Sequence, residues 1–130
     1  MQIECIHHIA ILTSTDLYEA SKTFYTEVLG FTLLAETYRA ERNSYKLDLA
    51  LNGVYQIELF SFPDHKERAS FPESKGLRHL AFAVKDVVSS RNWLLEKGVR
   101  TEELRVDSLT NKEFVFFYDP NGQPLELYQL

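Results

Sequence analysis

The sequence predicts an α+β fold in which two βαβββ modules are related by a pseudo-two-fold axis. Three observations support this prediction: an internal repeat, short runs in which apolar and polar residues alternate as in strands, and a helical pattern after the first run of each half. The chain has 130 residues, of which 45% are apolar. Such a chain can bury a core without a disulfide, so we expect a single domain spanning residues 1–130.

The two halves of the sequence carry the same landmarks at a spacing of about 70 residues. Residues 6–11 resemble residues 77–82, and further matches follow in the same order. The matched positions are His8 with His79, Asp16 with Asp86, Gly30 with Gly98, Asn52 with Asn121, and Glu58 with Glu126. We therefore assign module one to about residues 1–65 and module two to about residues 74–130.

Module one contains the signals for each element of a βαβββ unit. A strand is expected at about residues 4–12. Asp16 as N-cap with Glu19 three residues later is typical of a capping box, and Gly30 suits the left-handed position that ends a helix. The pair Asn52-Gly53 is typical of a two-residue hairpin turn. The three strands after the helix are expected at about 31–39, 45–51 and 54–62.

Module two repeats these signals. We expect a first strand at about residues 77–84, then a helix capped by Asp86 and ended by Gly98. The polar segment 63–75, which contains two prolines, is expected to join the modules as a loop. The last three strands are expected at about 100–107, 112–118 and 124–129.

The composition excludes several classes of function. The net charge of −5 disfavours binding to nucleic acids or to anionic membranes, because both require a basic face. No apolar run approaches the roughly 18 residues of a membrane-spanning helix, and the first residues lack the pattern of a secretion signal. Cys5 is the single cysteine, as expected for a reducing compartment. We therefore expect a cytoplasmic protein that binds neither nucleic acid nor membranes.

Four side chains at repeat-related positions form a candidate metal site: His8, Glu58, His79 and Glu126. Alternation in a strand places each histidine on the same side as small alanines, and each glutamate on the side away from its two aliphatic neighbours. A single histidine in a strand is usually structural, but the pattern occurs twice in the same order. Neutral imidazoles with carboxylates suit one divalent ion, with Ni²⁺ or Zn²⁺ first and Co²⁺, Mn²⁺ or Fe²⁺ as alternatives. His7 should face the other way and is left out of the ligand set.

These residues, with their surroundings, resemble the vicinal oxygen chelate superfamily, which contains glyoxalases, bleomycin resistance proteins and dioxygenases. The resemblance covers nearly the whole chain. It rests on residues 8–11, 24–25, 29–31, 57–60, 76–82, 119–122 and 125–127. It implies that the paired modules form a cupped mixed sheet around a metal, and that the protein is a homodimer.

The ligand set is most similar to that of glyoxalase I, which carries His, Glu, His and Glu in this order. The sequence also resembles a bacterial glyoxalase-related subfamily of the YaeR type. It departs from typical glyoxalase I in having about two more residues between His8 and Phe24, in Thr13, where an aliphatic residue is usual, and in Arg78, where a glycine is usual. These departures lie close to the metal ligands, so the substrate pocket is expected to differ.

The resemblance implies a lactoylglutathione lyase-like enzyme. Such an enzyme moves a proton on a hemithioacetal or another α-oxo compound, through an enediolate that the metal stabilises. Glu126 or Glu58 would act as the base, and the substrate would be an adduct of glutathione or of another thiol. The alternatives are an epimerase or thiol transferase of the same superfamily, or a metal-loaded protein that only binds a small ligand.

Further side chains are candidates for the pocket wall. An anionic thiol adduct needs a local basic group, and aromatic side chains on the later strands could line the cup. The candidate arginines are Arg39, Arg42, Arg78 and Arg105. The candidate aromatic residues are Tyr45, Phe60, Phe62, Phe117 and Tyr128.

Overall fold

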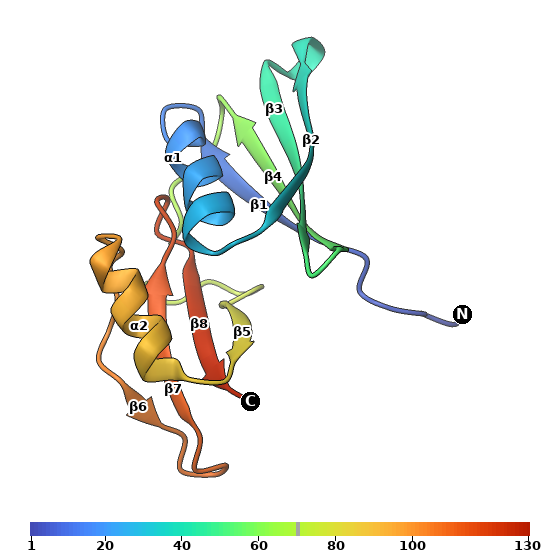
Figure 1. The fold of residues 1–130 in the computed structure, drawn as a ribbon. Helices are drawn as coiled ribbons and strands as arrows, with labels where there is room; N and C mark the ends of the chain where they lie inside the picture. Colours follow the sequence, from blue (N-terminus) through green and yellow to red (C-terminus); the bar gives the residue numbers. More distant parts are fainter. Residues whose placement is uncertain (70) are drawn as a thin grey trace. The chain divides into compact units, whose positions relative to one another are not determined.

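The computed structural model describes residues 1–69 and 71–130, so the joining loop expected at 63–75 lies partly outside the described residues. The described chain consists of two compact units, Met1–Lys66 and Glu67–Leu130 (Figure 1). Each unit carries its own sheet and its own helix, and the two are described separately below. No described helix combines the length and the apolar character that crossing a bilayer requires.

The first unit is a four-stranded mixed sheet with a helical segment between its first two strands. Strand β1 pairs in parallel with β4, and the other neighbours are antiparallel, in the order β1-β4-β3-β2. Helix α1 continues into one π-helical turn, Phe24–Val28. The bounds are β1 Ile9–Ser14, α1 Tyr18–Thr23, β2 Thr32–Arg39, β3 Ser44–Leu51 and β4 Val54–Phe62.

The second unit repeats this arrangement. Strand β5 pairs in parallel with β8, and the order is β5-β8-β7-β6. The bounds are β5 Leu80–Val84, α2 Val87–Glu96, β6 Arg105–Val106, β7 Glu113–Tyr118 and β8 Pro124–Gln129. The α+β class and the βαβββ order of both modules, which the repeat predicted, are therefore confirmed.

The core of each unit is built on the strand that comes last along the chain, β4 or β8. This strand lies between two neighbouring strands of its sheet. Alternate residues of β4 are buried, and Ile57 and Leu59 have almost no exposed surface. Leu125 and Leu127 occupy the matching positions of β8 and are also buried. Because side chains of a strand alternate between faces, Glu58 and Glu126 point away from these aliphatic residues, as the sequence predicted.

The two helices begin differently, which corrects one expectation. Asp86 is the N-cap of α2, and its side chain accepts a hydrogen bond from the backbone N–H of Ser89 at 2.8 Å. Asp16 is not the cap of α1: Leu17 holds that position, and no side chain caps it. The reason is a turn before the helix, in which the N–H of Leu17 donates to the carbonyl of Ser14 at 3.2 Å.

The strand expected at 100–107 also differs from the prediction, as do the strands expected at 4–12 and 77–84, which begin later, at Ile9 and Leu80. Only Arg105–Val106 forms a strand, and Thr101 makes an isolated bridge to Phe117. The N–H of Glu102 still donates to the carbonyl of Phe116 at 2.8 Å. Regular pairing is therefore interrupted between Glu102 and Arg105, and this is where the chain borders a pocket described below.

We expect Asp86→Ala to lower the free energy of unfolding by about 1 kcal/mol, because the first turn of α2 loses its side-chain acceptor. Equilibrium denaturation of the purified protein measures this change. Ser89→Ala is the control, since it keeps the backbone N–H that the cap satisfies and should change stability little. Equal stability of Asp86→Ala and the wild type would contradict the assigned cap.

Candidate functional site

Each unit contains one pair of a histidine and a glutamate at equivalent places in the sheet. In the first unit, Nε2 of His8 lies 3.3 Å from Oε2 of Glu58. In the second, Nε2 of His79 lies 3.1 Å from Oε2 of Glu126. The registers are also equivalent, because each glutamate lies opposite the second residue of the parallel first strand.

Both histidines directly precede a strand instead of lying within it. β1 begins at Ile9 and β5 at Leu80. The alternation expected at residues 7 and 8 therefore fails, and Nδ1 of His7 lies 2.8 Å from Nδ1 of His8. The expectation that His7 faces away from His8 is wrong for this reason. His79 keeps its place beside Glu126 because β5 still pairs with β8 directly after it.

The two pairs fit the donor set of a divalent ion. Two ligands that each lie about 2.1 Å from one ion at adjacent coordination positions are about 3.0 to 3.5 Å apart, and both pairs have this spacing. Nδ1 of His79 is buried without a hydrogen-bond partner. Among the residues that the structure describes, no group of three or more His, Cys, Asp or Glu could hold an ion by itself. Each pair therefore offers two ligands within its own unit.

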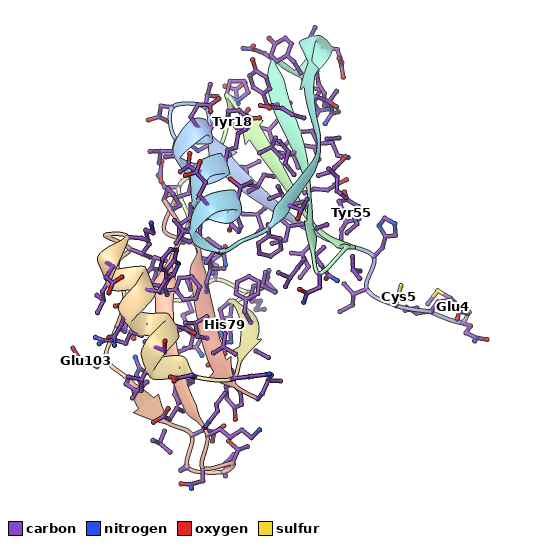
Figure 2. The ribbon with its side chains drawn as sticks, viewed as in Figure 1. Glu4, Cys5, Tyr18, Tyr55, His79 and Glu103 are labelled. Atoms are coloured by element: carbon purple, nitrogen blue, oxygen red, sulfur yellow. The ribbon has the colours of Figure 1, made fainter. Side chains whose placement is uncertain are left out.

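The glutamate of the first pair is held by two donors. Nζ of Lys46 lies 2.8 Å from Oε1 of Glu58. The hydroxyl of Tyr55, a side chain labelled in Figure 2, donates to the same oxygen at 2.6 Å. Lys46 also lies 2.7 Å from Oδ1 of Asp48. Burial alone would raise the pKa of Glu58, but the hydrogen bonds from Lys46 and Tyr55 outweigh it and hold that pKa below its usual value. Glu58 is therefore kept ionised and fixed in place.

The glutamate of the second pair has different surroundings. Phe116 lies opposite Glu126 in the sheet, where the first unit has Asp48 opposite Glu58. The ring of His79 meets that of Phe116 edge to face, with 5.1 Å between the ring centres. Over the described residues, His79 is the one basic side chain that pairs with Glu126. Among the described residues, no lysine or tyrosine donates to the other carboxylate oxygen of Glu126, whereas Lys46 and Tyr55 both donate to Oε1 of Glu58.

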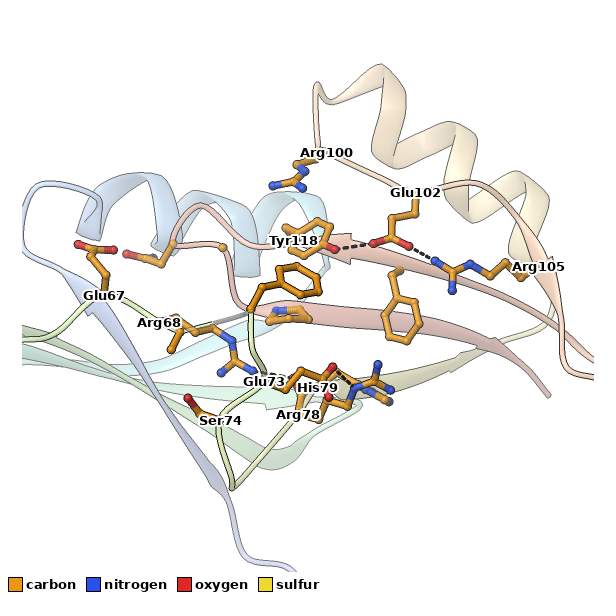
Figure 3. A pocket seen from close by; sticks show the side chains of 16 residues that line it. Glu67, Arg68, Glu73, Ser74, Arg78, His79, Arg100, Glu102, Arg105 and Tyr118 are labelled. Carbon is orange, nitrogen blue, oxygen red and sulfur yellow. Dashed lines mark hydrogen bonds and ion pairs between the residues drawn. The ribbon is translucent and has the colours of Figure 1, made fainter.

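A pocket of about 510 Å³ lies beside His79, wholly within the second unit (Figure 3). Phe116 and Tyr118 of β7 form part of its wall. The hydroxyl of Tyr118 donates to Oε1 of Glu102 at 2.5 Å, which raises the pKa of that tyrosine, and Glu102 also pairs with Arg105. Four guanidinium groups line the pocket: those of Arg68, Arg78, Arg100 and Arg105.

The candidate arginines separate into two groups. Arg78 and Arg105 line this pocket. Arg39 and Arg42 lie in the first unit, with their guanidinium carbons 5.6 Å and 5.4 Å from the ring centres of Phe60 and Phe62. Sequence reasoning missed Arg68 and Arg100. No local pattern marks them, because their place beside the pocket depends on the path of irregular segments.

The candidate aromatic residues have mixed outcomes. Phe117 is fully buried in the core and cannot line a cup, because its side chain faces opposite to those of Phe116 and Tyr118. Phe60 and Phe62 are half-buried, with stacked rings 5.5 Å apart. Tyr45 is exposed and stacks on Tyr18 at 4.7 Å. The hydroxyl of Tyr128 donates to Asp107 at 2.9 Å.

Comparison with known proteins gives consistent matches. Residues 5–127 match the family described as the Glyoxalase/Bleomycin resistance protein/Dioxygenase superfamily. The chain is 57% identical over 129 residues to the YwkD protein of Bacillus subtilis (strain 168), with 99% of each chain covered. It is 56% identical over 124 residues to the YaeR protein of Escherichia coli (strain K12), with 95% of each covered.

A solved structure shows the same fold at high similarity. The crystal structure of the glyoxalase family protein from Enterococcus faecalis is 47% identical in sequence, with a TM-score of 0.89. The alignment covers 98% of this chain and 99% of that chain.

We expect Lys46→Met to lower the free energy of unfolding at neutral pH by about 1 to 2 kcal/mol, because it leaves Asp48 and Glu58 as neighbouring uncompensated carboxylates. The pKa of Lys46 is raised by Asp48 and Glu58, and that of Glu58 is lowered. The stabilising contribution of Lys46 should therefore be fully present between pH 4.5 and pH 10.5, the ordinary pKa values of a glutamate and a lysine. It should vanish as the pH falls through the lowered pKa of Glu58, or rises through the raised pKa of Lys46.

Denaturation curves recorded at pH 3, at pH 7 and above pH 10.5 measure the contribution of Lys46 to the free energy of unfolding. Lys85→Met is the control, since Lys85 is an exposed lysine away from these carboxylates. A loss of stability that is the same at pH 3 and pH 7, or equal in the two variants, would contradict the interaction.

Proposed function

This chain belongs to the Glyoxalase/Bleomycin resistance protein/Dioxygenase superfamily, as its resemblance led us to expect, and from this premise we propose that it is a divalent-metal-dependent, glyoxalase I-like lyase or isomerase. The observation that carries the proposal is the pair of histidine and glutamate found at the same register in both units. The substrate would be a small α-oxo compound or a hemithioacetal.

In this proposal His8, Glu58, His79 and Glu126 are the ligands of one divalent ion, either from one chain or from two copies of it. Ni²⁺ and Zn²⁺ suit two imidazoles and two carboxylates best, and Co²⁺, Mn²⁺ and Fe²⁺ are alternatives. When bound, the ion supplies positive charge that stabilises a negatively charged substrate oxygen. The 3.3 Å and 3.1 Å spacings within the two pairs support this assignment.

The two glutamates have separate roles in the proposed reaction. Glu58 is held by Lys46 and Tyr55, so its proton affinity is low and its position fixed. Glu126 lies opposite Phe116 in the sheet, and among the described residues no lysine or tyrosine holds its carboxylate, whose one basic partner is His79. We therefore assign to Glu126 the removal of the proton next to the substrate carbonyl and its return to the neighbouring carbon, with Glu58 as an anchoring ligand.

The proposal extends to the assembly and the setting of the protein. We propose that the two modules act as one domain, that the chain is a cytoplasmic homodimer, and that its partner is a small molecule such as an adduct of glutathione or another thiol. Light scattering of the purified protein measures the dimer directly.

His79→Ala should abolish stoichiometric divalent-metal binding while leaving the fold intact, because the variant removes one of the two ligands of its unit. Metal content after reloading with Ni²⁺ or Zn²⁺, together with the far-ultraviolet circular dichroism spectrum, measures both effects. His65→Ala is the matched control, since His65 is exposed and lies outside the ligand set. Unchanged metal content in His79→Ala would remove the proposed site.

Glu126→Gln should lower turnover of the preformed methylglyoxal–glutathione hemithioacetal by about a hundredfold or more, because it removes the proton acceptor. Glu58→Gln should act mainly on metal affinity. The assay records lactoylglutathione formation by protein that was stripped of metal and reloaded with each ion in turn. If both variants kept full turnover and full metal content, the assigned chemistry would be wrong. Tight metal binding by the wild type without turnover would favour a different substrate or a binding protein.

A further inference from the structure

We infer that the substrate of the proposed site is a small 2-oxo or 2-hydroxy acid whose carboxylate is bound by Arg100 in the pocket of the second unit. This inference rests on the proposed function for the identity of the reacting end, which would face His79. The observation behind it is an imbalance of charge among the side chains of that pocket.

Two of the four arginines are neutralised by carboxylates of the same pocket. Nε of Arg78 lies 2.8 Å from Oε1 of Glu73, and Arg105 pairs with Glu102. Neither guanidinium needs a ligand to balance its charge. These ion pairs are exposed to solvent, so they serve to orient the side chains more than to stabilise the fold.

A third arginine has a structural task. Arg68 donates to the backbone carbonyls of Leu77 and Arg78 at 3.2 Å and 2.8 Å, and to Oε1 of Gln123 at 3.0 Å. These neutral acceptors use both terminal nitrogens of the guanidinium. Arg68 therefore ties the segment before β5 to the end of the β7–β8 turn, and it is a weaker candidate for binding a ligand.

Arg100 has no carboxylate partner among the described residues. Its guanidinium carbon lies over the ring of Tyr118, 4.3 Å from the ring centre. This cation–π contact uses none of the N–H groups of the guanidinium, which can donate two parallel hydrogen bonds to one carboxylate. The ring of Tyr118 is itself held by its hydrogen bond to Glu102, so Arg100 rests on a fixed surface.

The charge of the pocket matches a monoanion. Four arginines and three glutamates line it, and because Arg78 and Arg105 are paired with glutamates while Arg68 is held by neutral acceptors, Arg100 is the guanidinium left to take an anionic ligand. The glutamates are Glu67, Glu73 and Glu102. One carboxylate matches the charge of this guanidinium, whereas a phosphate dianion would bring a second negative charge into a pocket that already holds three glutamates.

The same pocket connects Arg100 with the proposed metal ligand. His79, Tyr118 and Arg100, which are labelled in Figure 3, line it together with Phe116. The ring of Phe116 meets that of His79 edge to face. A small acid can therefore place its carboxylate at Arg100 and its oxo or hydroxyl carbon on the side of His79 and Glu126. Phe116 offers the apolar surface for the carbon atoms between them.

Calorimetric titration of the full chain tests the inference. The probes are pyruvate, 2-oxobutyrate and D-lactate as monocarboxylates, hydroxyacetone as a neutral α-hydroxycarbonyl compound, and inorganic phosphate as a multivalent anion. We expect the acids to bind with the highest affinity, and added salt to weaken them. Arg100→Gln should reduce their affinity about tenfold or more, and Arg100→Lys by less, because it keeps the charge but loses the bidentate geometry.

Lys97→Gln is the matched control, since Nζ of Lys97 also lies over an aromatic ring of this unit, 4.4 Å from the centre of Trp93, but outside the pocket. Its affinity for the acids should equal that of the wild type. The inference is overturned if no acid binds, if Arg100→Gln binds the acids as well as the wild type does, or if hydroxyacetone or phosphate binds more tightly than pyruvate.

Titration of metal-stripped and metal-loaded protein separates this inference from the proposed function. Binding of acids that depends on Arg100, in a protein that takes up no divalent ion, would contradict the proposed function and keep the carboxylate site. Stoichiometric metal binding with acid affinity that is independent of Arg100 would keep the proposed function and contradict the carboxylate site.

Discussion

The parallel pairing of the first and last strands is the constraint on which each unit depends. In both units this pairing sets one register, with Ala10 opposite Glu58 and Ala81 opposite Glu126. Parallel strands cannot be joined by a tight turn, so the helix and two antiparallel strands must lie between them in the sequence. The same pairing brings a histidine just before the first strand to within 3.3 Å or 3.1 Å of a glutamate that is about 50 residues away.

Equivalent backbone positions carry unequal chemistry in the two units. Asp48 and Lys46 surround the carboxylate of Glu58, and together with Tyr55 they fix it as an anion. The matching surface beside Glu126 is aromatic. The hydrogen bonds from Lys46 and Tyr55 hold the pKa of Glu58 below its usual value, whereas no lysine or tyrosine of the described residues pairs with Glu126. The repeat therefore contains two similar pairs of histidine and glutamate, and different residues on the neighbouring strand, Asp48 and Phe116, give the two glutamates different surroundings.

The pocket of the second unit extends this asymmetry. It forms where the expected strand at 100–107 departs from regular pairing, so that Arg100 and Glu102 flank the wall formed by Phe116 and Tyr118. Ion pairs cancel two of its arginines, and backbone carbonyls hold a third. The guanidinium of Arg100, which lies over the ring of Tyr118, has no carboxylate partner among the described residues, in a chain with a net charge of −5. A local cation within an acidic protein restricts which small molecules can enter.

The sequence by itself determined the repeat, the α+β class, the order of elements and the faces of Glu58 and Glu126, because these follow from local periodicity and from turn residues such as Asn52-Gly53. The family was expected from the resemblance of its motifs to those of a known superfamily, and the match over residues 5–127 confirms it. Only the tertiary structure decided that Leu17 caps the first helix, that His7 lies against His8, that Phe117 is buried, and that Arg100 borders the pocket. These features depend on where irregular segments run and on which neighbours compete for each polar group, and neither is encoded in the pattern of nearby residues.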